Sequence, residues 1–138
     1  MTTLEILLGD ASVTVRDALG KLARLADEAL RARADEYDRT ATFPKASFDA
    51  LFGAGLLGAT IPIEAGGLGF GHHRRNTFPL WMMTKLVAKA DLSLARCWEG
   101  HTNSLVLIDA LGTPDTVHER VRAALQGAFP GTFLAPAE

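Results

Sequence analysis

The chain has 138 residues, 48% of them hydrophobic and 22% charged, so we expect one globular domain rather than a disordered chain. Its formal net charge of -2 lacks the basic excess of a dedicated nucleic-acid-binding protein. The single cysteine, Cys97, excludes an internal disulfide scaffold. No apolar run approaches the ~20 residues that span a bilayer, and the N-terminal segment lacks the basic region of a signal peptide. We therefore expect a cytoplasmic protein without a membrane span.

Two helices are predicted in the first part of the chain. The first spans about residues 13–38, because apolar side chains recur there at steps of three and four residues between charges of both signs. Its apolar stripe comprises Val15, Leu19, Leu22, Ala26, Ala29 and Tyr37. The second helix begins at Pro44, since proline suits a first helical position. It ends at Gly53 and Gly55, because glycine adopts the left-handed conformation of a helix end.

A glycine-rich segment, residues 56–71, is predicted to form a long ordered loop after the second helix. It fits neither the G-x-G-x-x-G fingerprint of dinucleotide-binding proteins nor the P-loop motif, so we do not expect it to cradle a phosphate. A basic cluster follows it, made of His72, His73, Arg74 and Arg75. We expect this cluster to be an exposed loop, with binding of a phosphate or an acidic partner as the alternative.

Three more helices are predicted in the second half of the chain. The third spans about residues 79–90, and its buried side is formed by Trp81, Met82, Leu86 and Ala90. Asp91 is a suitable N-cap for the fourth helix, which ends at Gly112. The apolar spacing of the fourth helix involves Leu94, Trp98, His101, Leu105 and Ile108. Thr113 and Pro114 supply the cap and the first residue of the fifth helix.

These elements predict an all-α domain, a bundle of about five helices with a long glycine-rich loop between the second and the third. Residues 12–127 are expected to form the structured core, and residues 128–138 a tail. On the fourth helix Cys97 and His101 share a face, but a metal site needs three or four ligands, so we expect none. His101 is then either a packed core histidine or a functional group in a ligand pocket.

Five motifs in order along the chain resemble the N-terminal domain of the acyl-CoA dehydrogenase superfamily. They are G-L-L-G at 55–58, I-P-I-E-A-G-G-L-G at 61–69, D-L-S-L-A at 91–95, G-H at 100–101 within the fourth helix and G-T-P at 112–114. Each motif is weak, but their common order is fairly specific, and the resemblance covers about residues 22–127. It implies a three-part enzyme in which this helical domain precedes a β-domain and a C-terminal helical domain.

The resemblance also implies where the chemistry lies. FAD, or reduced flavin in the monooxygenase branch, sits between the β-domain and the C-terminal domain, which carries the catalytic glutamate. This sequence stops at residues 135–138, where the β-domain would begin, so we expect no catalytic residue in it. The isolated chain is expected to be inactive and to carry flavin only when partner domains are supplied. A second chain with those domains, or a homo-oligomer, would be the partner.

In the family, the fourth helix and the glycine loop help to shape the acyl pocket. The resemblance therefore implies four pocket candidates, Trp98, His101, Thr102 and Leu105, and three loop residues, Gly66, Gly67 and Gly69. In the monooxygenase branch a histidine on this helix approaches the flavin and the substrate, and His101 is the matching residue. Its pKa range suits proton transfer near neutral pH.

Several functions follow as hypotheses. The first is part of an acyl-CoA dehydrogenase-type oxidoreductase of fatty acid metabolism, binding an acyl-CoA-like molecule. The alternatives are a non-catalytic helical binding or architectural subunit, part of a flavin-dependent monooxygenase, and an unrelated helical interaction domain. An exposed apolar face would indicate a partner or a dimer. Candidates for it are Leu56, Leu57, Ile61, Ile63, Leu68, Phe70, Trp81, Met82 and Met83.

Overall fold

The computed structural model describes residues 8, 11–71 and 76–129, and all regular structure in these residues is helical. The elements are α2 (Val13–Leu25), a π turn η1 (Ala26–Leu30), α3 (Arg31–Thr40), α4 (Lys45–Gly53), a 3-10 turn η2 (Ile63–Ala65), α5 (Thr77–Ala90), α6 (Leu92–Leu111) and α7 (Pro114–Leu125). Because α2, η1 and α3 are continuous, the described residues form five helical rods. The predicted all-α bundle is confirmed, and the glycine-rich loop lies between α4 and α5.

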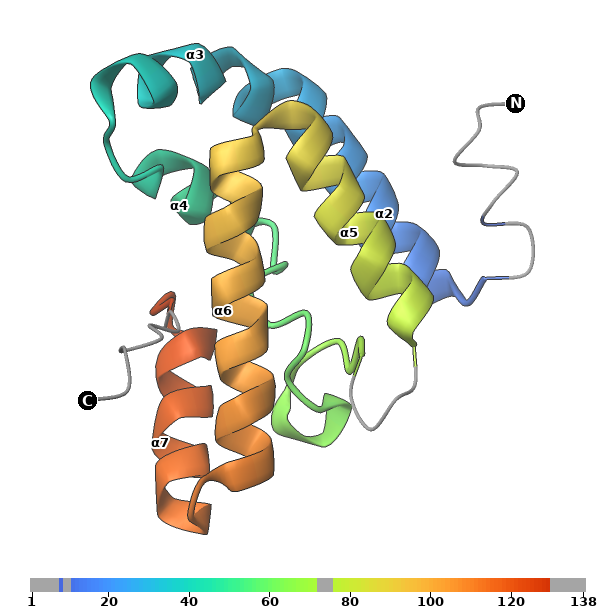
Figure 1. Ribbon diagram of the computed structural model, residues 1–138. Helices are drawn as coiled ribbons and strands as arrows, with labels where there is room; N and C mark the ends of the chain where they lie inside the picture. The colour runs from blue at the N-terminus through green and yellow to red at the C-terminus, as the bar shows by residue number, and fades with distance from the viewer. Residues whose placement is uncertain (1–7, 9–10, 72–75, 130–138) are drawn as a thin grey trace.

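Helix α6 runs through the middle of the molecule (Figure 1). Helix α5 precedes it and packs against both α6 and α2, while α7 lies along its second half. Helices α3 and α4 cover the end of the bundle at which α6 begins. The glycine-rich loop lies beside the second half of α6 (Figure 1), and Ile61 of the loop packs with Leu105 of this helix.

The first helix is not the uniform α-helix that the sequence predicts. A π turn at Ala26–Leu30 interrupts it, and α3 beyond the turn buries none of its residues. Leu22, Ala26 and Leu30 are all buried and follow one another in four-residue steps. Side chains four residues apart lie on one face of a helix, so the π turn falls within the buried stripe of the first rod.

The helix ends follow the local rules that the sequence predicts. The Oδ1 atom of Asp91 accepts a hydrogen bond from the Leu94 amide at 2.9 Å and caps α6. The Thr113 hydroxyl accepts one from the Thr116 amide at 3.3 Å and caps α7. Helix α5 begins at Thr77, slightly before the predicted start at Pro79.

The main core lies between α2, η1, α4, α5 and the first half of α6, with the completely buried indole of Trp98 in it. A second, small core forms where the glycine loop meets the end of the bundle. It consists of Ile61, Leu105 and Ala124, with Val121 packed against it. The loop, α6 and α7 are therefore joined by three buried apolar side chains.

Most of the apolar face expected from the sequence is buried, which corrects that prediction. The buried members are Leu56, Leu57, Ile61, Phe70, Met82 and Met83, and Leu68 is half-buried. Only Ile63 and Trp81 are open, with 67% and 68% of their surfaces exposed. Trp81 was predicted on the buried side of its helix. Met82, Met83 and Val87 fill the space toward the core instead, and Trp81 is turned outward.

Candidate functional site

The glycine loop closes on itself through its backbone. Four N–H groups donate to loop carbonyls at 2.8–3.0 Å: Gly67 to Pro62, Leu68 to Gly58, Gly69 to Ile61 and Phe70 to Ala59. These amides are consequently not available to hold a phosphate group, as the sequence motifs already indicated. The neighbouring cluster of residues 72–75 lies outside the described residues.

Two features of this loop require glycine. At Gly67 a Cβ atom would lie 2.2 Å from the Ile61 carbonyl oxygen and 2.4 Å from the Ile61 Cβ. At Gly66 and Gly69 the φ angles are +93° and +65°, in the region that L residues rarely adopt. Gly66, Gly67 and Gly69 thus fix the path of the loop.

His101 connects the loop to α6. Its side chain is 1% exposed, and its Nε2–H donates to the Leu57 carbonyl oxygen at 2.8 Å. Its ring lies 6.2 Å, between centroids, from both Trp98 and Phe48. The histidine therefore supports the segment that enters the glycine loop.

The other three predicted pocket residues lie on the same helix but face different surroundings. Trp98 is in the main core, and Leu105 is in the second core with Ile61. Thr102 is also buried, and its backbone carbonyl accepts a hydrogen bond from the Thr60 hydroxyl at 3.2 Å. Of the four candidates, Thr102 is the one that lines a groove between the helices.

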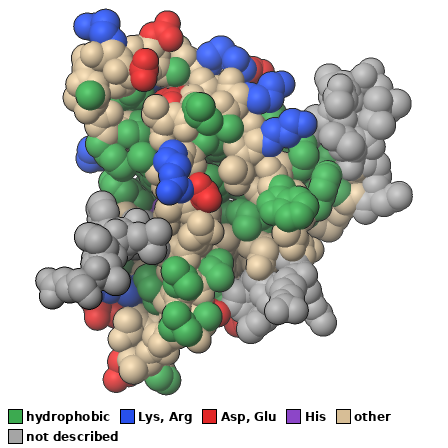
Figure 2. Space-filling model, in the orientation of Figure 1, with side chains coloured by type: hydrophobic (Ala, Val, Ile, Leu, Met, Phe, Trp, Pro, Cys, Tyr) green, Lys and Arg blue, Asp and Glu red, His purple; other side chains and the backbone are tan. Residues whose placement is uncertain are grey.

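This groove, which we call the α5–α6 groove, is an open cleft of about 450 Å³. Its aromatic and polar lining consists of Trp81, Thr84, Lys85, Glu99, Thr102 and Asn103. Toward the start of α6 it continues into a second hollow of about 430 Å³, which shares Thr84, Ala88 and Glu99 with it. In Figure 2 hydrophobic side chains gather over the first part of α5, and side chains of both charges lie over the first half of α6.

The groove combines one aromatic surface with polar groups of several kinds. The Thr84 and Thr102 hydroxyls donate to carbonyls of their own helices, each at 3.1 Å, so their oxygens can still accept. Glu99 Oε2 accepts from Arg96 at 2.6 Å. Among the described residues Lys85 and Asn103 have no side-chain partner, so their polar atoms are available to a ligand.

Sequence reasoning missed Trp81, Lys85, Glu99 and Asn103 as site residues. The spacing could have grouped them, because Trp81 and Lys85 are four residues apart on α5, as are Glu99 and Asn103 on α6. Sequence spacing does not tell how far each helix is rotated about its own axis in the packed fold. That rotation brings the two pairs to the same opening.

Residues 14–127 match the family described as acyl-CoA dehydrogenase, N-terminal domain. The chain belongs to this family. Two curated relatives are L-evernosamine nitrososynthase of a Micromonospora species and amino sugar nitrososynthase RubN8 of Streptomyces rubradiris. The chain is 39% identical to the first over 92 residues, which are 66% of the chain and 20% of that relative. It is 41% identical to the second over 64 residues, or 44% of the chain and 15% of that relative.

The chain of this acyl-CoA dehydrogenase-type domain thus spans about a fifth or less of the curated relatives that it matches. No solved structure matches it with comparable significance. In the described part of the domain no helix is long and apolar enough to cross a membrane. The same residues contain no group of three side chains suited to bind a metal ion.

The hollows described between the helices of the domain are open surface grooves, and four loop amides are bonded within the loop. We therefore assign no flavin-binding residue to this chain.

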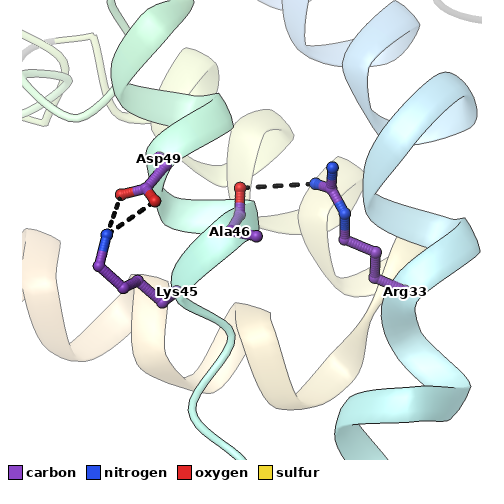
Figure 3. A network of polar contacts seen from close by, with 4 residues as sticks. All are labelled: Arg33, Lys45, Ala46 and Asp49. Atoms are coloured by element: carbon purple, nitrogen blue, oxygen red, sulfur yellow. Dashed lines mark hydrogen bonds and ion pairs between the residues drawn. The ribbon is translucent and has the colours of Figure 1, made fainter.

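Two further polar features of the domain are structural. Burial, assisted by the nearby Asp91 carboxylate, raises the pKa of the Cys97 thiol, which favours the less reactive protonated form. Separately, Arg33 of α3 donates to the Ala46 carbonyl of α4 at 3.4 Å, and Lys45 pairs with Asp49 within α4 at 2.7 Å (Figure 3). Because this network is exposed, it joins α3 to α4 with little net energy.

Proposed function

We propose that the chain is the N-terminal helical domain of a flavin-dependent oxidoreductase that oxidises the amino group of an amino sugar. The observation that carries this proposal is the 39% identity over 92 residues to a nitrososynthase, together with the 41% identity to a second one. In the proposed enzyme this domain forms one wall of the substrate site, and other domains complete it. Those domains are supplied by further parts of the same protein or by a second chain.

The chemistry requires an oxidant and a source of electrons. Oxidation of a primary amine to a hydroxylamine consumes one O₂, two electrons and two protons, and releases one water. Oxidation of the hydroxylamine to a nitroso group consumes the same again and releases two waters. A reduced flavin bound elsewhere in the enzyme would supply the electrons. The task of this chain is to bind and orient the sugar.

The groove supports an amino sugar better than an acyl chain as the ligand. A fatty acyl chain calls for an apolar channel, because a buried polar group without a partner costs free energy. The α5–α6 groove has the apolar Leu80 and Ala88 in its lining, but it also presents Lys85, Glu99 and Asn103 beside its indole. We therefore favour amine oxidation over the acyl-CoA dehydrogenase reaction suggested by the family resemblance alone.

The test begins with the protein purified under native conditions from its own host. A visible absorbance spectrum is recorded, and the protein is then incubated with an amino sugar, a flavin-reducing system and O₂ while the products are followed by mass spectrometry. We expect flavin bands at near-stoichiometric level and conversion of the amine into hydroxylamine and nitroso products. A colourless protein that leaves the amine intact would overturn the proposal and favour a non-catalytic module.

A further inference from the structure

We infer that the α5–α6 groove is a saccharide subsite in which the Trp81 indole stacks on one face of the sugar ring. The inference rests on the proposed function and adds to it the place and the side chains by which the sugar is held. Three features of the molecule support it: the exposure of the indole, the free polar groups around it and the shape of the α5–α6 groove.

The exposure of Trp81 is the first observation. An indole is the largest apolar side chain, yet 68% of this one is exposed while Trp98 is completely buried. Trp81 packs poorly against its own domain and lies at the rim of the groove. A flat indole face suits the C–H groups on one face of a pyranose ring, since it is apolar over its body and polar only at its N–H.

The polar groups around the indole are the second observation. Lys85 lies one helical turn from Trp81, and Asn103 lies across the groove on α6. Neither makes a side-chain hydrogen bond among the described residues. Together with the acceptor oxygens of Thr84 and Thr102, they supply donors and acceptors at different positions. A ligand with several hydroxyl groups needs such a mixture, whereas an acyl chain or a lone anion does not.

The shape of the hollow is the third observation. Its volume of about 450 Å³ is in the range of small-molecule sites, and it is open along one side. A separate groove of about 360 Å³ between η2 and α7 has no Trp, Tyr or Phe in its lining, and its one ring, the His118 imidazole, is already bonded to Arg122. A third, beside the glycine loop, is only about 140 Å³. Among the described grooves, the α5–α6 groove is the one that offers a stacking surface and free polar groups together.

The experiment is an NMR titration of the 138-residue chain with glucosamine and, separately, with glucose. The two tryptophans give two indole N–H signals, so Trp98 in the core serves as an internal reference for Trp81. We expect saccharide to shift the Trp81 indole and the Asn103 side-chain amide, and to leave the Trp98 indole in place. The substitutions Trp81→Ala and Asn103→Ala should each weaken binding by about tenfold.

Leu111→Ala is the matched control, because Leu111 is 80% exposed on α6 but lies outside the groove. Its affinity for saccharide should equal that of the unchanged chain. The inference is overturned if no signal of the groove shifts at saturating sugar, or if Trp81→Ala binds as well as Leu111→Ala. A spectrum of each variant without sugar verifies its fold.

The outcomes also separate the subsite from the proposed function. If the native flavoprotein oxidises an amino sugar and Trp81→Ala leaves its KM unchanged, the subsite is wrong and the proposed function stands. If sugar binds in the groove but no amine is oxidised, the subsite stands and the proposed function is wrong.

Discussion

Gly67 shows how a single residue fixes the glycine loop. Its Cα passes so close to the backbone at Ile61 that a Cβ would overlap the Ile61 carbonyl at 2.2 Å. The substitution Gly67→Ala must therefore displace backbone rather than a flexible side-chain end. We expect it to lower the free energy of unfolding by about 1–3 kcal/mol, the usual cost of overpacking, measured by urea denaturation.

Gly53→Ala is the control for this prediction, because a Cβ at Gly53 has no neighbour within 4 Å. Gly53 is the last residue of α4, so alanine there should be neutral or should stabilise by about 0.4–1 kcal/mol. If the two substitutions have equal effects, the close approach at Ile61 is not what requires glycine at position 67.

Cys97 offers a second prediction at the residue scale. Burial raises the pKa of its thiol, and the negative charge of Asp91 raises it further. A raised pKa lowers the thiolate fraction at any given pH below it, and the thiolate is the reactive form. We expect Cys97 to react with a disulfide reagent at pH 8 more slowly in the native chain than in urea. Equal rates in the two states would contradict this.

The side chain of Asp91 caps the N-terminus of α6 and so fixes where this helix begins. Asp91 is buried, and its carboxylate accepts from the Leu94 amide at 2.9 Å. Asp91→Ala should destabilise the chain by about 0.5–2 kcal/mol in thermal or urea unfolding. Asp91→Asn keeps a capping oxygen, so it should cost less, and it should also accelerate the reaction of Cys97. A loss as large for asparagine as for alanine would exclude the cap as the cause.

Element boundaries were largely predictable because their causes are local. A cap such as Asp91 or Thr113 acts on amides within its own first turn, so the sequence contains the whole interaction. The π turn at Ala26–Leu30 was not predicted. The turn packs against α4 and α5, which come from later parts of the chain, so local rules do not include its surroundings.

The candidate site was less predictable than the fold for the same reason. Spacing alone placed Trp98, His101, Thr102 and Leu105 on one helix, but it did not show that His101 bonds to the Leu57 carbonyl. Nor did it show that Trp81 is turned out of the core. Which face of a helix becomes a groove depends on the rotation of its neighbour, and this appears only when α5 and α6 are packed together.

At the scale of the whole molecule, Leu105 holds together three parts of the chain. Its buried side chain forms the second core together with Ile61 of the loop and Ala124 of α7. We expect Leu105→Ala to lower the free energy of unfolding by about 2–5 kcal/mol, from lost transfer energy and the cavity left behind. The measurement is urea denaturation.

Leu107→Ala is the matched comparison, because Leu107 lies on the same helix and is 46% exposed. Its substitution should change the stability far less than that of Leu105. If both substitutions cost the same, the second core does not join the loop to α6 and α7 as described.

A single residue, Asp91, joins α5 to α6, and the two helices diverge from that junction (Figure 1). The two walls of the groove are therefore linked at the end near Asp91. Because α5 and α6 lie farther apart with distance from Asp91, a bulky substituent of a ligand fits best at the open end of the groove. Because the backbone link already sets the two helices beside each other, a ligand that enters the groove has little of the chain to order. The conformational entropy lost on binding is then small.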